Sequence, residues 1–151
     1  MEKFIKAQEI DYKIALSEVK SGKKQSHWIW YIFPQLIGLG KSNNSNHYGI
    51  RDLEEAKLFL SHEILGKNLR EITSALLEID GKSALEIFGE TDMKKVKSCM
   101  TLFDLADGQP NSIFNQVLEK YYDGFKDETT INRLREPLVV VAGATGKLGV
   151  K

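Results

Sequence analysis

Apolar residues recur every three or four positions through most of the chain, which is the spacing of an amphipathic helix with one buried face. The clearest series predicts a helix over 65–79 that ends at Gly81. Residues 3–20 show the same spacing and predict a first helix. Asp52 and Glu55 have the D-x-x-E spacing of a helix start and predict a further, short helix. The stripe of the clearest series consists of Leu65, Leu69, Ile72, Leu76 and Ile79.

Prolines and glycines divide the chain into short elements. Pro34 follows a continuously apolar run, which predicts a short buried helix ending near Phe33. Further helix ends are predicted at Gly89, at 107–110 and at Gly124. Because no useful stretch before the tail alternates with period two, we predict an all-α fold. It should be a compact, single-domain array of six to eight helices over residues 1–135.

Residues 136–151 form an atypical apolar and glycine-rich tail. An apolar run at 138–142 precedes three glycines with the G-x-x-G-x-x-G spacing of a Rossmann dinucleotide-binding turn. That function needs a βαβ unit of roughly 30 residues, whereas only two residues follow the last glycine. The tail therefore looks like a truncated Rossmann opening, and a truncated fusion, an altered gene model and a coincidental sequence are the three explanations; we expect no cofactor. The three glycines are Gly143, Gly146 and Gly149.

The composition excludes several classes of protein. With 21 basic and 21 acidic residues the formal net charge is zero, so no overall positive field draws the chain to a nucleic acid polymer or an anionic membrane. No stretch approaches the roughly 20 apolar residues that span a bilayer, and no export signal is visible. The single cysteine, Cys99, excludes an internal disulfide and favours a reducing, cytoplasmic location.

Residues 26–50 are depleted in charge, since Lys41 is the only charged residue apart from two histidines. The segment also holds both tryptophans, and flat rings beside neutral hydrogen-bonding groups are typical of concave ligand sites. His27 is a candidate catalytic acid or base, although a hydrogen-bonded core histidine is the common alternative. The stretch 38–49 is either an anion-binding nest near Lys41 or an ordinary Asn/Gly loop. The candidate ligand-binding residues here are Trp28, Trp30, Gln35, Lys41, Ser42 and Tyr48.

A second candidate surface lies on the helix predicted around residues 92–103. Lysines and hydroxyls fall on one side of this helix, where they could hold a phosphate or carboxylate. Asp92 is a candidate catalytic acid or base, and the candidate ligand-binding residues are Lys95, Ser98 and Thr101. The alternative is a solvated lysine edge above a buried apolar stripe.

The sequence predicts no metal site. His62 and Glu63 begin like the HExxH motif, but Gly66 stands where the second histidine should be. Cys99 has no histidine nearby in sequence, so we interpret it as a small buried residue rather than a nucleophile.

Several uninterrupted motifs resemble one known family. The runs SHWIWYIFPQ at 26–35, GLGKS at 38–42 and SCMTLF at 98–103 are similar to those of the bacterial domain-of-unknown-function family 1810, sometimes labelled calpastatin. The resemblance covers about residues 1–135 and implies an all-helical fold, with motif residues in both candidate segments. It implies no reaction. In general layout the chain also resembles, more distantly, NADAR-type N-glycosidases, which cleave ADP-ribosyl or riboflavin-precursor bonds.

These observations favour a protein that binds a small anionic ligand, nucleotide- or ribose-phosphate-like, in an aromatic pocket. Hydrolysis with His27 or Asp92 as acid or base is the reaction such a site would support. The hypothesis requires residues 26–50 and 92–103 to meet and enclose a cavity. The alternative is a helical protein-interaction module whose tryptophan segment is pure core. A third hypothesis is the N-terminal appendage of a dehydrogenase-like fusion.

Overall fold

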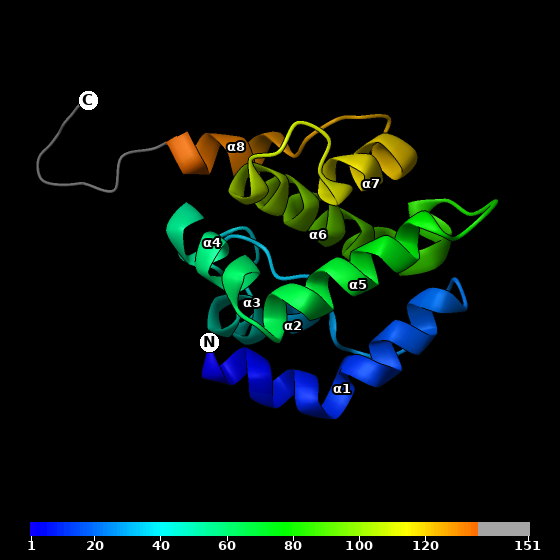
Figure 1. The fold of residues 1–151 in the computed structure, drawn as a ribbon, viewed down its shortest axis with the longest axis horizontal. Helices are drawn as coiled ribbons and strands as arrows, with labels where there is room; N and C mark the ends of the chain where they lie inside the picture. Colours follow the sequence, from blue (N-terminus) through cyan, green and yellow to red (C-terminus); the bar gives the residue numbers. More distant parts are fainter. Residues whose placement is uncertain (136–151) are drawn as a thin grey trace, which may run out of the picture.

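The computed structural model describes residues 1–135, which form eight helices (Figure 1). They are α1 (Glu2–Lys20), α2 (Ile29–Ile32), α3 (Asn43–His47), α4 (Leu53–Ser61), α5 (Leu65–Leu77), α6 (Ala84–Asp107), α7 (Ile113–Tyr122) and α8 (Glu128–Arg135). The only β pairing in this described part is an isolated parallel bridge between Leu36 and Ile50. The predicted all-α fold of six to eight helices is therefore confirmed.

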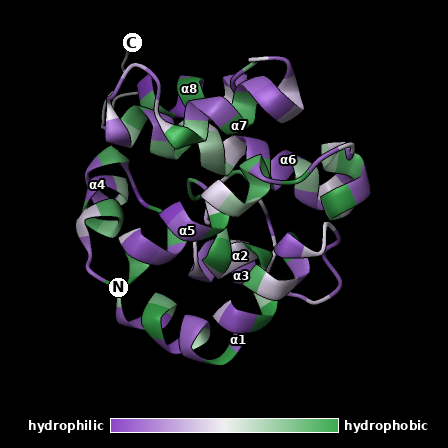
Figure 2. Cartoon of the chain, turned by 45° about the vertical axis from the view of Figure 1, so that its right-hand side comes forward, coloured by the Kyte–Doolittle hydropathy of each residue, from purple (hydrophilic) through white to green (hydrophobic). Residues whose placement is uncertain are grey.

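Helix α5 lies at the centre of the fold, between α1 on one side and α6 and α7 on the other (Figure 1). Helix α4 packs on both α5 and α6, and α8 lies along α6. Each long helix carries apolar and polar residues together (Figure 2), as expected where one face of each helix is buried and the other is exposed. The resulting core is continuous from α1 to α7.

The stripe predicted on α5 is the middle of this core. Leu65, Leu69, Ile72 and Leu76 are at most 1% exposed. Past the end of the helix, Gly81 adopts a positive φ of 71°, which glycine tolerates without strain. The Lys120 ammonium of α7 donates to the Leu77 carbonyl at 2.8 Å, so a side chain satisfies one of the orphan carbonyls at this helix end.

Side-chain caps start four of the first seven helices. The predicted Asp52 start signal is confirmed, because its carboxylate accepts from the Glu55 backbone N–H at 2.8 Å. The other caps are Ser42 for α3, Ser83 for α6 and Ser112 for α7. The stretch 38–49 is thus not a plain loop but contains a short helix. The predicted break at Gly89 is also present, as a residue with φ 81° that interrupts α6.

The carboxylate of Glu18, near the end of α1, holds the segment that leads into α2. Its Oε1 accepts from the backbone N–H groups of Gln25 and Ser26, at 2.7 and 2.9 Å, and from the Trp28 indole N–H at 2.9 Å. Its Oε2 accepts from the Ser26 hydroxyl at 2.5 Å. Burial opposes the charged form, but these hydrogen bonds outweigh it and lower the pKa of Glu18 to about 2.

Replacing Glu18 with glutamine should remove this clamp and lower the free energy of unfolding by about 1–2 kcal/mol at neutral pH, because charge-assisted hydrogen bonds are lost. The lowered pKa also means that the wild-type carboxylate stabilises the fold above about pH 4.5 and loses this contribution as the pH falls towards about 2. Urea denaturation at a series of pH values should show a shallower acid loss for Glu18→Gln. The exposed Glu9→Gln on the same helix is the control; equal pH profiles for all three proteins would contradict the clamp.

Candidate functional site

The two segments singled out in the sequence lie together, and two adjoining hollows occur between them. The larger one, here called the polar pocket, has a volume of about 340 Å³, and the smaller one, the indole crevice, has about 10 Å³. Gln35 and Lys95 line both hollows. The remaining lining of the polar pocket is Leu39, Gly40, Thr91, Lys94, Ser98, Asp127 and Thr129. The remaining lining of the indole crevice is Ile29, Trp30, Phe33, Ser45, Tyr48 and Gly49.

A cluster of three charges lies behind the polar pocket. The Asp92 carboxylate is 2.9 Å from the Lys24 ammonium and 3.6 Å from the Lys95 ammonium. These side chains are only 18%, 8% and 19% exposed, respectively. Two mostly buried positive charges therefore share one negative charge. The Lys95 ammonium also lies 5.9 Å from the centre of the Trp30 ring, which joins the cluster to the indole crevice.

The start of α8 forms one wall of the polar pocket and is anchored to α6. The Thr101 hydroxyl donates to the Lys97 carbonyl and accepts from the Asp127 backbone N–H, both at 2.9 Å. The Asp127 carboxylate accepts from the Thr130 backbone N–H at 2.9 Å and from its hydroxyl at 2.6 Å. The Asp127 carboxylate thus caps the first turn of α8. Thr101 is fully buried and holds the start of α8 against α6 through its hydrogen bond with the Asp127 N–H.

Gly40 allows the loop after Gln35 to pack closely on α3. A Cβ atom at this position would lie 2.4 Å from the Ser45 hydroxyl oxygen, a distance that no real Cβ atom tolerates. Ser45 itself is buried and contributes to the indole crevice. The glycine-rich stretch therefore acts here by permitting a close approach between two walls of the site.

Five of the residues predicted to bind a ligand line these hollows. Trp30 and Tyr48 line the crevice, Ser98 lines the polar pocket, and Gln35 lines both, as does Lys95. Their proposed contacts with a ligand stay predictions.

The other predicted site residues lie elsewhere. Trp28 has no exposed area and belongs to the core, where its N–H bonds to Glu18. His27 and Lys41 are exposed and line neither hollow. The Ser42 hydroxyl caps α3 by accepting from the Ser45 backbone N–H at 3.1 Å.

Sequence reasoning missed Lys24, Asp127 and Thr129. Lys24 lies in a basic loop just before the apolar segment, but nothing local shows that it reaches Asp92. The D-x-x-T spacing of Asp127 and Thr130 is a helix start signal that would have located the α8 wall.

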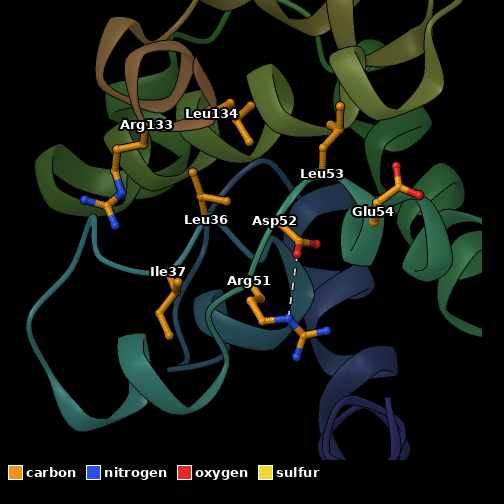
Figure 3. A pocket seen from close by; sticks show the side chains of 8 residues that line it. All are labelled: Leu36, Ile37, Arg51, Asp52, Leu53, Glu54, Arg133 and Leu134. Atoms are coloured by element: carbon orange, nitrogen blue, oxygen red, sulfur yellow. Dashed lines mark ion pairs between the residues drawn. The ribbon is translucent and has the colours of Figure 1, made fainter. Parts of the chain in front are cut away.

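A third hollow, between the end of α8 and the start of α4, has a volume of about 310 Å³ (Figure 3). Its charged lining is balanced, with two arginines against two acids, and Arg51 already contacts Asp52 at 3.8 Å. Arg133 and Leu134 reach it from α8 (Figure 3). The charge balance gives this hollow no preference for an anion. Its lining is Leu36, Ile37, Arg51, Asp52, Leu53, Glu54, Arg133 and Leu134.

The structure of residues 1–135 also bears on Cys99, on metal binding and on membrane-spanning helices. Burial raises the pKa of the Cys99 thiol well above its usual value, which keeps it protonated and inert, as expected. No group of three or more potential metal-ligating side chains gathers in this part of the chain. Nor does any of its helices have the length and apolar character to cross a membrane. The glycine pattern of the tail, residues 136–151, lies outside the described residues.

Comparison with known proteins agrees with this fold. The family model for a protein of unknown function, DUF1810, matches residues 1–134. The chain belongs to this family. The crystal structure of the conserved hypothetical protein Rv1873 from Mycobacterium tuberculosis is similar, with a TM-score of 0.86 and 42% identity over 90% of this chain and 96% of that chain. No curated protein matches the chain. Membership in DUF1810 confirms the resemblance seen in the motifs and brings no reaction with it.

Substitutions at the neighbouring residues His27 and Trp28 test whether Trp28 is a core residue and His27 a surface residue. Trp28→Phe should lower the free energy of unfolding by about 1–3 kcal/mol, because it leaves a small cavity and removes a donor from Glu18. His27→Ala should change it by less than about 0.5 kcal/mol, as is usual for an exposed side chain. Urea denaturation followed by circular dichroism measures both. Equal effects of the two substitutions would show that Trp28 is not a core residue.

Proposed function

We propose that this DUF1810 protein binds a small anionic ligand, nucleotide- or ribose-phosphate-like, in the polar pocket. The observation that carries the proposal is the cluster of Lys24, Asp92 and Lys95, in which two mostly buried ammonium groups share one carboxylate. An incompletely compensated charge away from water is costly. An anion beside Lys95 would supply the missing negative charge.

The lining of the polar pocket supports an anion in other ways. Lys94 adds a second ammonium from the same helix, and Thr91, Ser98 and Thr129 add hydroxyl groups. Asp127 is the one acid among the described lining residues, and its carboxylate is already engaged by Thr130. Lysine ammonium groups with hydroxyl donors are a common means of holding a phosphoryl group.

The sizes of the two hollows limit the ligand. A volume of about 340 Å³ is at the lower end of the roughly 300–1,000 Å³ that small-molecule sites occupy. None of the described residues lining the polar pocket is aromatic. The indole crevice, at about 10 Å³, is too small for a nucleobase. A sugar phosphate, or the phosphate end of a mononucleotide, therefore suits the site better than a dinucleotide.

Binding, rather than hydrolysis, is the function proposed. Asp92 contacts two ammonium groups, which suits a role in positioning Lys95. His27 is exposed. Neither is among the residues that line the polar pocket. Incubating any ligand that binds with the protein and analysing the mixture by mass spectrometry would detect turnover directly.

Lys95→Gln is the decisive substitution. It removes the ammonium at the junction of the two hollows but leaves Asp92 paired with Lys24, so the fold should be retained. Affinity for ribose 5-phosphate, AMP and inorganic phosphate should fall at least about tenfold, because a charge-assisted contact worth about 1.5–3 kcal/mol is lost. Isothermal titration and ligand-induced thermal shift measure the loss.

The matched control is Lys67→Gln, which removes the same charge from the exposed surface of α5 and should bind the phosphates as wild type does. Ribose and adenosine, which lack the phosphate, should bind weakly to all three proteins. Unchanged phosphate affinity in Lys95→Gln, or equal binding of ribose and ribose 5-phosphate, would refute the proposal.

One observation favours the alternative of a protein-interaction module. Ile10 and Ile14 lie one turn apart on α1 and are 76% and 48% exposed. A partner protein could cover this small apolar pair. Such a role would not account for the unbalanced charge beside the polar pocket, so it is the second candidate.

A further inference from the structure

The indole nitrogen of Trp30 is a buried donor without an acceptor. Only it and the Thr73 hydroxyl oxygen, among buried side-chain polar atoms of the described residues, have no hydrogen-bond partner. An unsatisfied buried N–H is unfavourable and calls for an explanation at each site where it occurs. The other tryptophan provides the contrast, since the Trp28 N–H donates to Glu18 at 2.9 Å.

Trp30 lines a crevice that is rich in donors. The Lys95 ammonium lies 5.9 Å from the centre of the Trp30 ring and lines the same crevice. An indole N–H and an ammonium can only donate hydrogen bonds. No acidic side chain is among the described residues of the crevice, and Gln35, Ser45 and Tyr48 supply groups that both donate and accept. The crevice therefore lacks an anionic acceptor.

The size of the crevice identifies what fits there. Its volume of about 10 Å³ is close to that of a single water-sized sphere, so it admits one oxygen atom and little more. Because Gln35 and Lys95 line both hollows, the crevice adjoins the polar pocket. An anion with several terminal oxygens could place one of them in the crevice and the others near Lys94.

We propose that Trp30 determines the specificity of the anion site by donating its indole N–H to one terminal oxygen of the bound ligand, beside Lys95. This inference rests on the proposed function and adds the chemical class of the ligand. A phosphoryl group, with three terminal oxygens on one phosphorus, meets the requirement. Chloride also accepts hydrogen bonds, but it is a single atom larger than oxygen and cannot occupy the water-sized crevice and the polar pocket at once.

The test observes the two indole N–H groups directly, by ¹H–¹⁵N NMR of the full chain during titration with inorganic phosphate. The Trp30 indole proton should move downfield as its hydrogen bond forms, whereas the Trp28 proton should stay in place. The same concentrations of chloride should move neither. Trp30→Phe removes one of the two indole resonances and thereby assigns both of them. The same substitution should weaken phosphate binding about tenfold. Triple-resonance experiments on the wild type provide the assignment if Trp30→Phe does not fold.

The outcomes separate this inference from the proposed function. If phosphate binds in a Lys95-dependent manner but the Trp30 resonance stays in place, the role of Trp30 is overturned and the proposed function stands. If the Trp30 proton is already downfield without phosphate and does not move, a water molecule fills the crevice and the inference is wrong. If phosphate does not bind at all, both proposals fall.

Discussion

The position of the site depends on the hydrogen bonds that the Glu18 carboxylate accepts. The segment between α1 and α2 has backbone N–H groups that are not paired within a helix, and it leads into the most apolar part of the chain. Leaving such N–H groups buried without a partner would be unfavourable. Glu18 satisfies the N–H groups of Gln25 and Ser26 together with the Trp28 indole. With the segment held in this way, Trp28 fills the core. The Lys24 backbone N–H meets the Ile87 carbonyl on α6 at 2.8 Å, which brings its ammonium to Asp92.

The charge arrangement around α6 follows from this attachment. Lys24 contacts one carboxylate oxygen of Asp92 and Lys95 contacts the other, so that one carboxylate is shared by two lysines. The third hollow, between α8 and the start of α4, is different because its two arginines face two acids. Charge balance, more than size, therefore distinguishes these hollows, since their volumes are about 340 and 310 Å³. An excess of positive charge with few competing acceptors is the property that suits an anion.

The two tryptophans illustrate how a single fold assigns different roles to the same side chain. Trp28 lies inside, with its N–H satisfied and its ring packed against Phe33. Trp30, two positions later, is only partly buried, and its N–H has no partner. Residues two positions apart on a helix point roughly 200° away from each other. Trp28 therefore completes the core, whereas Trp30 borders a hollow.

The sequence by itself determined the class of the fold, the α5 stripe, the Asp52 cap and the burial of much of the charge-depleted segment. These features depend on residues within a few positions of one another, because helical periodicity and capping are local. It also indicated that residues 26–50 and 92–103 carry the candidate site. Only the tertiary structure decided which of their side chains border a hollow, that Lys24 reaches Asp92, and that α8 forms a wall. Those pairings join residues far apart in the chain, and their geometry depends on how whole helices pack rather than on local spacing.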